Sequence, residues 1–425
     1  RFLPQVLEAR TREVEHVVLV DGDGPETITL DELGQRRARG FDFEAAWRAV
    51  EPDDVVTLIY TSGTTGPPKA AQLTHASVLF QSRAVDAVLP VPRGGRGISY
   101  LPSAHVGDRV LSHYTLSICF GTTLTSVADH RQVGAALPEV RPTLFGGVPR
   151  VWEKLKAGLE SAGIVDPAQL PDAAKAAVRA RIGLDHAVWC ISAAAPIATD
   201  VLRYFTALGL PLLEGWGMSE ISCFGTMNPP HDVRVGSVGT ALPGVELRLL
   251  DDGELLVRAP LVMKGYRGDP ARTAEALDAE GWLHTGDVAR IDDDGYVTIV
   301  DRKKELIINS AGKNMSPANV EHQLRGASSL IAHAVCIGDR RPYNVALLVL
   351  DPDASGRLGA DELRARLDAA VAAANVRLSR VEQIKRYAVL PGDWQPGGDE
   401  LTPTSKLKRR VVLEKYAPVI EDLYR

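Results

Sequence analysis

The sequence is poor in cysteine and lacks the cysteine patterns of disulfide-stapled domains. Its 425 residues include four cysteines, Cys119, Cys190, Cys223 and Cys336, which lie far apart and form no Cys-x-x-Cys pair. Cysteines this few and this widely spaced predict free thiols in a reducing compartment. We therefore expect a cytoplasmic protein.

Long apolar runs, a signal peptide and basic stripes are also lacking. No run approaches the length of a membrane span, and the chain opens on Arg1 without a secretory leader. The 48 basic residues are outnumbered by 54 acidic ones and form no stripe, so we expect no nucleic-acid partner. The composition, 45% hydrophobic and 24% charged, predicts a soluble globular protein, and the length predicts two or three domains.

One loop concentrates hydroxyl groups, glycines and a lysine. It reads Tyr60-Thr61-Ser62-Gly63-Thr64-Thr65-Gly66-Pro67-Pro68-Lys69, after a β-branched run at 55–59 and before a helical pattern from Thr74 to Val88. Thr74 is the expected N-cap of that helix. Glycines let backbone N–H groups surround an anion, hydroxyls add donors, and Lys69 adds a positive charge. The loop predicts a polyphosphate site; the alternative is a polar turn without a ligand. It is not a Walker loop, because no Gly-Lys-Ser/Thr opens the helix.

Polar or small residues also follow three predicted strands, where ligands of α/β sheets usually bind. His105 comes after the strand at 98–102, and Ser192-Ala193-Ala194-Ala195-Pro196 follows the strand at 187–191. The strand at 211–213 ends in Glu214-Gly215-Trp216-Gly217-Met218-Ser219-Glu220. Trp216 offers an aromatic face, and Glu220 offers a hard oxygen ligand for Mg²⁺. The alternatives are a structural histidine and a packed tryptophan in a glycine-rich turn.

The second half of the chain contains a change of pattern after residue 301. Asp292-Asp293-Asp294-Gly295 predicts a hairpin turn rather than a calcium loop. The charged run Asp301-Arg302-Lys303-Lys304-Glu305 then ends a strand, and an α+β pattern restarts beyond it. That pattern comprises a helix at 317–325, strands at 331–337 and 345–350, a helix at 361–375, a strand at 384–390 and a final helix. We therefore divide the chain into domains at 1–301 and 302–425.

Two loops of the second domain carry lysines. Residues 309–315 read Asn-Ser-Ala-Gly-Lys-Asn-Met, with Gly312 at their centre, and residues 401–410 read Leu-Thr-Pro-Thr-Ser-Lys-Leu-Lys-Arg-Arg, with Lys406. For the second loop, the alternative is a solvated basic segment.

Six of these motifs, in this order from residue 60 to residue 410, resemble those of the adenylate-forming enzymes. The resemblance covers nearly the whole chain and is greatest to the long-chain fatty acyl-CoA synthetases, which residues 148–154 also resemble. It implies an α/β fold with a large N-terminal adenylate-forming domain of mixed sheets and packed helices, and a small mobile α+β C-terminal domain. It implies an acid–thiol ligase that uses ATP, Mg²⁺ and coenzyme A. A fatty carboxylate attacks ATP to give acyl-AMP and pyrophosphate, and the CoA thiol then displaces AMP.

The same resemblance implies roles for individual residues. The residues implied to bind the nucleotide phosphates are those of the first loop, Thr61, Ser62, Gly63, Thr64, Thr65, Gly66 and Lys69. Those implied to bind Mg²⁺ are Thr61 and Glu220. The other nucleotide-binding residues are Ala194, Trp216, Gly217, Ser219, Asp287 at the ribose, Arg302, Lys304 at the hinge, and Gly312. His105 and Ala193 are implied to contact the acyl substrate. The implied catalytic residues are Lys406, Glu220 and Lys69. Ala193 stands in place of a common glycine and Trp216 in place of a common tyrosine, which reshapes the adenine pocket.

Several questions stay open at this point. Members of the family carry a longer segment before the first loop than the 59 residues present here, so we expect either a fragment or a shortened protein with impaired activity. The alternative functions are a fatty acyl-AMP ligase that donates to a carrier protein, a nucleotide-binding remnant, and an unrelated phosphate-loop ATPase. Chain-length preference, homodimer formation and peripheral membrane contact are left open.

Overall fold

The computed structural model describes residues 2–36, 38, 40–61, 68–309, 313–356, 358–395, 397–402 and 406–425. These residues fall into two compact units, Arg1–Glu51 and Pro52–Arg425, and we describe each unit by itself. The predicted phosphate-loop residues Ser62, Gly63, Thr64, Thr65 and Gly66 lie outside the described residues, as does Gly312.

The first unit contains short elements only. They are α1 (Leu3–Glu8), β1 (Val18–Leu19), β2 (Ile28–Thr29), α2 (Leu30–Gln35) and α3 (Phe43–Arg48). Strands β1 and β2 pair in parallel, and a capping box between Thr29 and Glu32 begins α2. The elements are short: β1 has two residues and α3 has six.

The second unit begins with the hairpin that frames the predicted phosphate loop. β3 (Val55–Thr61) pairs antiparallel with β4 (Lys69–Thr74), and β14 (Gly265–Tyr266) extends the sheet beside β4. Helix α4 (His75–Val88) follows with Thr74 as its N-cap, which confirms the helix and the cap predicted from the sequence. Strand β4 was not predicted, because its alanines have little preference for strands and only pairing on both edges places them in a sheet.

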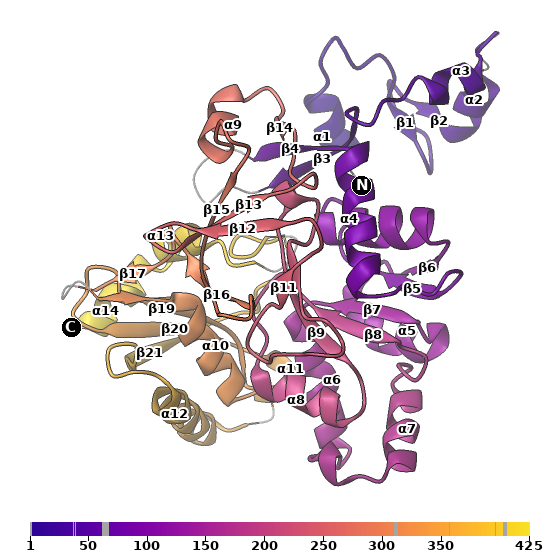
Figure 1. Ribbon diagram of the computed structural model, residues 1–425. Helices are drawn as coiled ribbons and strands as arrows, with labels where there is room; N and C mark the ends of the chain where they lie inside the picture. Colours follow the sequence, from indigo (N-terminus) through magenta and orange to yellow (C-terminus); the bar gives the residue numbers. More distant parts are fainter. Residues whose placement is uncertain are drawn as a thin grey trace. The chain divides into compact units, whose positions relative to one another are not determined.

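A five-stranded sheet forms the centre of this unit, in the order β11-β10-β9-β8-β7 (Figure 1). Its parallel part comprises β7 (Leu144–Gly147), β8 (Trp189–Ser192) and β9 (Leu212–Trp216). The short strands β10 (Thr226–Met227) and β11 (Thr240–Ala241) add to it in antiparallel fashion. The 3₁₀ turn η2 (His130–Gln132) and helix α5 (Val133–Val140) precede β7 in the chain. Between the strands lie the helices α6 (Pro149–Ser161), α7 (Asp172–Arg181) and α8 (Thr199–Ala207), with the 3₁₀ turns η3 (Pro167–Gln169) and η4 (Ser219–Ile221).

The two faces of the parallel strands are buried against different cores. Phe145, Cys190 and Leu212 pack with residues of α5, α6 and α8. Their sequence neighbours Leu144, Ile191 and Leu213 pack with α4 and the π-helix η1 (Gly107–Cys119). Because consecutive strand residues point to opposite faces, the short apolar strands are buried on both sides. Strand β5 (Arg96–Ser99) precedes η1 in the chain and strand β6 (Thr123–Ser126) follows it. The two strands pair in parallel as a small separate sheet.

An antiparallel sheet follows, in the order β12-β13-β15-β16. Its strands are β12 (Glu246–Leu249), β13 (Glu254–Arg258), β15 (Leu283–Ile291) and β16 (Val297–Arg302), and α9 (Pro270–Ala276) precedes β15. The turn at Asp292–Gly295 joins β15 to β16, which confirms the predicted hairpin.

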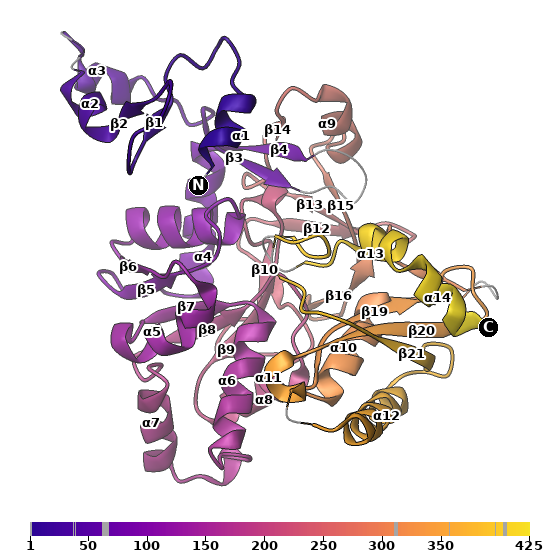
Figure 2. The same cartoon turned by 180° about the vertical axis from the view of Figure 1, so that it is seen from behind.

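The C-terminal part is a sheet with helices on both faces (Figures 1 and 2). Strands β19 (Ile331–Ile337), β20 (Asn344–Leu350) and β21 (Ile384–Leu390) form the sheet, beside the small pair β17 (Ile307–Ile308) and β18 (Asn314–Met315). Helices α10 (Pro317–Ala327) and α12 (Ala360–Arg377) cover one face, and α14 (Ala417–Tyr424) covers the other. The remaining helices are α11 (Pro352–Ser355) and α13 (Arg409–Lys415).

Three sequence expectations can be compared with this structure. The α/β fold class is confirmed. All four cysteines are free, and only Cys119 is exposed. Within the described residues, no helix combines the length and the apolar character that crossing a bilayer requires. The domain division at 301/302 stays a prediction.

Candidate active site

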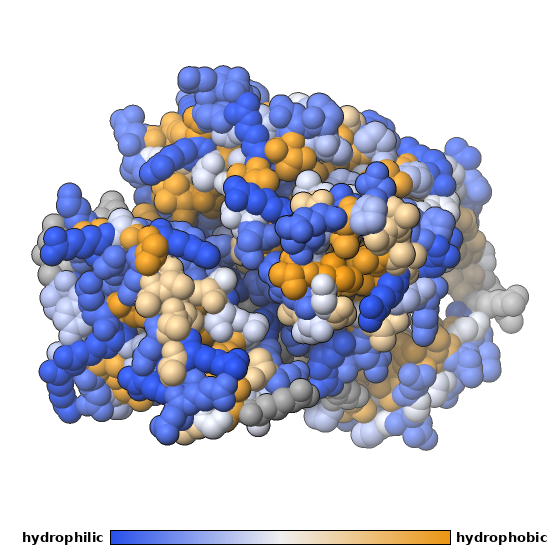
Figure 3. Space-filling model, turned by 90° about the horizontal axis from the view of Figure 1, so that it is seen from below, coloured by the Kyte–Doolittle hydropathy of each residue, from blue (hydrophilic) through white to orange (hydrophobic). Residues whose placement is uncertain are grey.

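All of the predicted site residues that the structure describes line one cleft of about 2720 Å³. They are Thr61, Lys69, His105, Ala193, Ala194, Trp216, Gly217, Ser219, Glu220, Asp287, Arg302, Lys304 and Lys406. The face seen from below is hollowed near its centre (Figure 3). Residues of α6, α8 and α10 are among those that line the cleft. The structure thus brings together residues from segments up to 345 residues apart, from Thr61 to Lys406, and their roles stay predictions.

The two residues at the base of the first loop face each other across a hairpin. Thr61 ends β3, Lys69 begins β4, and the two are paired in the register of the strands. The Thr61 hydroxyl donates to the Lys69 carbonyl at 3.5 Å, which is a weak contact. The β3–β4 hairpin thus brings the lysine and the hydroxyl to one end of the cleft, where both can act on the same anion.

Tyr266 lies between two of the predicted residues, and the sequence reading missed it. Its hydroxyl donates to Glu220 Oε1 at 2.9 Å, and the Lys69 ammonium lies 4.8 Å from the centre of its ring. Burial, together with the Glu220 carboxylate, raises the pKa of Tyr266, so the hydroxyl stays a donor. Tyr266 reaches this position only because β14 pairs with β4, a contact that residue spacing does not reveal.

Glu220 is a buried carboxylate in the first turn after β9. It belongs to η4 and is 7% exposed. Among the described residues, no group of three or more His, Cys, Asp or Glu side chains could hold a metal by itself. Mg²⁺ is commonly held by one or two carboxylates together with substrate phosphates, so Glu220 and the Thr61 hydroxyl fit a magnesium ion that arrives with a nucleotide.

Trp216, Asp287 and Arg302 form a connected group on the wall of the cleft. The Trp216 indole N–H donates to Asp287 Oδ2 at 2.8 Å, and Arg302 Nε lies 2.6 Å from Asp287 Oδ1. Burial raises the pKa of Asp287, and the nearby Arg302, Trp216 and Lys406 oppose that rise. Two donors therefore fix the orientation of one buried carboxylate. Trp216 is 7% exposed, so most of its ring surface is already packed within the protein.

The turns around Trp216 and Ala194 are tightly built. A side chain at Gly217 would meet the Cys223 carbonyl oxygen at 1.5 Å, so only glycine fits there. Ala194 has a positive φ of 75°, a conformation that costs energy for an alanine and that marks functional turns. The neighbouring Ser192 hydroxyl is buried and has no hydrogen-bond partner among the described residues.

His105 is held in a defined protonation state. Its Nδ1 accepts the Gly107 amide hydrogen at 3.1 Å. Burial, followed by the charge of Lys406, lowers the pKa of His105 to about 4. The ring is therefore neutral near pH 7 and carries its proton on Nε2, which makes Nε2 a donor.

Lys406 comes from the C-terminal part and enters the same cleft. Desolvation and the charge of Arg302 lower its pKa, whereas the carboxylates of Asp287, Glu220 and Glu305 oppose that change. The side chain still reaches solvent in the cleft. The backbone around it is closed on itself, since Lys406 N donates to Thr402 Oγ1 at 3.0 Å and Thr402 N donates to the Lys406 carbonyl at 2.8 Å.

Glu214 is a second acid in this region, and the sequence reading gave it no role. It lines the cleft at the end of β9. Burial raises its pKa to about 7, and the Gly236 amide N–H, 3.4 Å from Oε2, opposes the rise only weakly. The sequence signal that could have identified Glu214 is its position at a strand end, directly before the Gly-Trp-Gly turn.

Comparison with known proteins gives consistent results along the chain. The profile of the family described as "AMP-binding enzyme" matches residues 2–267, and that described as "AMP-binding enzyme C-terminal domain" matches residues 304–425. The chain is 49% identical to fadD11 of Mycobacterium tuberculosis (strain ATCC 25618 / H37Rv), a provisionally named fatty-acid–CoA ligase, over 94% of this chain and 79% of that protein. It is 35% identical to the long-chain-fatty-acid–CoA ligase FadD15 of Mycobacterium bovis (strain ATCC BAA-935 / AF2122/97), over 97% of this chain and 76% of that protein.

Two solved structures are similar in fold. The anthranilate CoA ligase AuaEII in complex with anthranoyl-AMP has a TM-score of 0.77 at 20% identity, over 99% of this chain and 78% of that one. The O-succinylbenzoate–CoA synthetase MenE of Bacillus subtilis, in complex with ATP and magnesium ion, has a TM-score of 0.69 at 25% identity. That match covers 90% of this chain and 74% of MenE. The structural likeness thus covers both the central sheets and the C-terminal part.

Proposed function

We propose a function on one premise: the chain belongs to the family of AMP-binding enzymes, with a large AMP-binding domain followed by the family's C-terminal domain. We infer that it is a fatty-acid–CoA ligase, and more narrowly that its acids are long-chain ones. The observation that carries this proposal is the single cleft in which a lysine, a buried glutamate and a buried aspartate converge from separate segments. The names of fadD11 and FadD15 support the fatty-acid and CoA substrates.

The first half-reaction joins two anions. An oxygen of the fatty carboxylate attacks the α-phosphorus of ATP, and the bond to the bridging oxygen of pyrophosphate breaks. Cations and N–H donors must offset the charge that gathers at the α-phosphate. Lys69 at the base of the first loop and Lys406 from the C-terminal part both line the cleft and supply these cations.

The neutral His105 can donate from Nε2 to the fatty carboxylate without becoming charged itself. In that role it orients the nucleophile, while Asp287, held by Trp216 and Arg302, accepts from the ribose hydroxyls. Glu220 and Thr61 would hold the magnesium ion, which when bound offsets the negative charge of the phosphates.

The second half-reaction needs another surface next to the acyl-adenylate. The CoA thiolate attacks the acyl carbonyl, the mixed anhydride bond breaks, and AMP leaves. We propose that the C-terminal part turns about Lys304, so that the loop carrying Gly312 replaces the loop carrying Lys406. The interval between the matches of the two family profiles, at residues 268–303, ends directly before this lysine.

The test is fatty-acid-dependent exchange of labelled pyrophosphate into ATP, run over a chain-length series, followed by CoA-dependent release of AMP. The proposal predicts exchange that increases toward long chains and AMP release that requires CoA.

Other outcomes identify the alternatives. Exchange without a response to CoA indicates a fatty acyl-AMP ligase. Nucleotide binding without exchange indicates a remnant. Release of inorganic phosphate without any fatty acid indicates an ATPase.

A further inference from the structure

A buried arginine connects the segment that carries Lys406 to the body of the C-terminal part. Arg409 is the first residue of α13, three residues after Lys406, and 16% of its side chain is exposed. Its two terminal nitrogens donate to Glu321 Oε1 and Oε2 at 2.6 and 3.0 Å. Two such bonds fix both the position and the plane of a guanidinium group.

Glu321 is itself firmly held. It lies on α10, is 9% exposed, and its Oε1 also accepts the Cys336 amide hydrogen at 2.8 Å. Arg409 donates in addition to the Cys336 carbonyl at 3.3 Å. The arginine is therefore tied to both helix α10 and strand β19, which belong to the core of the C-terminal part.

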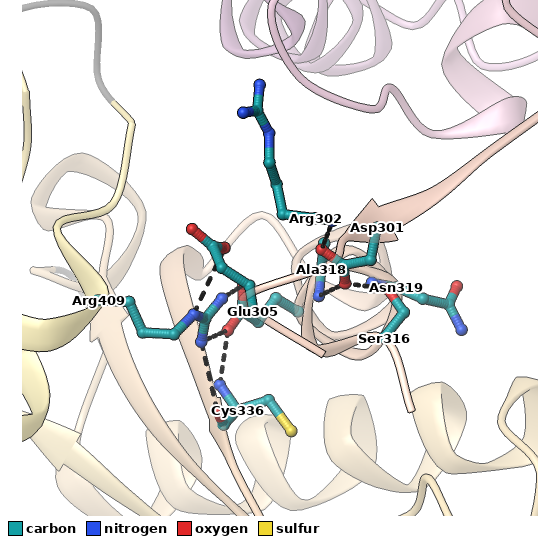
Figure 4. Close-up of polar contacts among 9 residues, drawn as sticks. Asp301, Arg302, Glu305, Ser316, Ala318, Asn319, Cys336 and Arg409 are labelled. Carbon is teal, nitrogen blue, oxygen red and sulfur yellow. Dashed lines mark hydrogen bonds and ion pairs between the residues drawn. The ribbon is translucent and has the colours of Figure 1, made fainter. Parts of the chain in front are cut away.

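A third contact reaches the segment beside Lys304. Glu305 Oε2 lies 3.7 Å from Arg409 Nε, and this Nε makes no hydrogen bond within the described residues. Figure 4 shows Arg409 between Glu305 and Cys336, with the side chain of Arg302 pointing away from this group. One side chain at the start of α13 thus contacts α10, β19 and the residue that follows the proposed hinge.

The Lys406 loop has other anchors among the described residues: Lys408 N donates to the Glu400 carbonyl, and the Lys408 ammonium donates to the Gly398 carbonyl, both at 2.8 Å. The arms of the loop are joined to each other by the Thr402–Lys406 hydrogen bonds and by the bridge between Leu401 and Leu407. These bonds join the two described arms of the loop to each other, whereas Arg409 joins one arm to α10. Leu401, which is 1% exposed, anchors one arm, and Arg409 anchors the other.

We propose that Arg409 is a positioning residue for Lys406: by fixing the start of α13 on Glu321, it sets the reach of Lys406 into the cleft. This inference rests on the proposed function for the assignment of Lys406 to the first half-reaction. A lysine at position 409 would keep the charge but lose the two parallel bonds, so the first turn of α13 could shift. A shift of about 1 Å in a reacting group costs on the order of 10²-fold in rate.

The experiment compares Arg409→Lys with Arg410→Lys. Arg410 is the adjacent, exposed residue, and it pairs only with Glu414 on its own helix at 2.9 Å. We expect Arg409→Lys to lose about 10-fold to 10²-fold in pyrophosphate exchange. Thioester formation from preformed acyl-adenylate and CoA should stay within about twofold of the wild-type rate, because that step does not use Lys406. The Arg410→Lys variant should match wild type in both assays.

Two results would overturn the inference. If both half-reactions of Arg409→Lys fall in the same proportion, together with the melting temperature, Arg409 has only a structural role. If exchange is unchanged, the reach of Lys406 does not depend on Arg409.

A second readout does not depend on activity. The rate at which acetic anhydride modifies Lys406, measured by mass spectrometry without substrates, should differ between Arg409→Lys and Arg410→Lys, because displacement changes both the exposure of the amine and the surroundings, Arg302 among them, that lower its pKa. Equal rates would overturn the inference even in an active enzyme. If the wild-type protein shows no fatty-acid-dependent exchange and the modification rates still differ, the proposed function fails and the positioning role of Arg409 stands.

Discussion

The two sides of the cleft are built differently. On the side of the central sheets, functional groups hold one another: Trp216 donates to Asp287, and Tyr266 donates to Glu220. Each of these four side chains is at most 7% exposed. On the C-terminal side, Lys304 and Lys406 are exposed and make no side-chain hydrogen bond within the described residues.

The side chains of the central sheets are therefore preorganised, whereas the lysines of the C-terminal part reach the cleft only when that part moves into place. Buried and mutually bonded side chains cost little reorganisation when a charged transition state forms. A lysine on another domain acts only while that domain faces the nucleotide. Between the two sides, α6 reaches the C-terminal part through ion pairs of Arg150 with Asp351 and of Glu153 with Arg325. We infer that these pairs hold the arrangement in which Lys406 reaches the cleft.

The largest expected effect comes from removing the arriving cation. Lys406→Ala should reduce fatty-acid-dependent pyrophosphate exchange by on the order of 10²–10³-fold, because two anions must then meet without it. With preformed acyl-adenylate and CoA, the variant should still form thioester. The matched control is Lys408→Ala, which removes a lysine whose ammonium donates to the Gly398 carbonyl. Normal exchange by Lys406→Ala, or equal loss in both assays, would show that this loop is assigned wrongly.

The next effect belongs to the preorganised side. Glu220→Gln keeps an oxygen that can accept from Tyr266 but removes the charge, so exchange should fall by roughly 10²-fold. The measurement is exchange as a function of Mg²⁺ concentration, with Tyr266→Phe as the variant that removes only the hydrogen bond. Full exchange by Glu220→Gln at low Mg²⁺ would exclude Glu220 as a metal ligand.

A smaller effect is expected from the bond that orients Asp287. Trp216→Phe removes one hydrogen bond to a buried carboxylate, so the dissociation constant of AMP should rise roughly tenfold. Calorimetric titration measures this constant directly. Trp189→Phe is a suitable control, because Trp189 is also buried and its indole makes only a 3.4 Å contact with the Pro90 carbonyl. Equal AMP affinity in wild type and Trp216→Phe would contradict the orienting role.

The smallest effect concerns the ion pairs between the two sides. Arg150→Ala should slow exchange by about fivefold and leave thioester formation unaffected, since a partly exposed pair is worth about 1 kcal/mol. Arg150 is the better partner to change, because Asp351 also caps α11. The same measurement at high salt should narrow the difference between variant and wild type. An effect on thioester formation alone would mean that the pairs act in the other half-reaction.

Much of the fold was predictable because its signals are local. Strands β19 and β21 have the predicted bounds, 331–337 and 384–390, since β-branched and apolar residues dominate both. The hairpin at 292–295 was also predicted, and Arg234 pairs with Asp292 and Asp294 from outside it. These acids are therefore engaged in ion pairs at a turn.

The site was predictable as a list of residues but not as a network. Motifs in order singled out Trp216, Glu220 and Asp287, and one cleft gathers them. The bond from Trp216 to Asp287 spans 71 residues, and that from Tyr266 to Glu220 spans 46. Which side chains meet at such separations depends on how the sheets pack, and periodicity carries no information about it. The burial of Arg409 against Glu321 is likewise not visible in a basic run, which by itself is also typical of a solvated segment.

The central claim, that one side of the cleft is fixed and the other exchanges between half-reactions, is tested most directly at Lys304. Its backbone N–H donates no hydrogen bond within the described residues, so proline removes none there and acts by fixing φ. The measurement is the ratio of thioester formation to pyrophosphate exchange in Lys304→Pro. The account predicts that exchange is retained and that thioester formation is lost, because the C-terminal part stays with Lys406 in the cleft. An equal fall in both half-reactions, with the ratio unchanged, would contradict it.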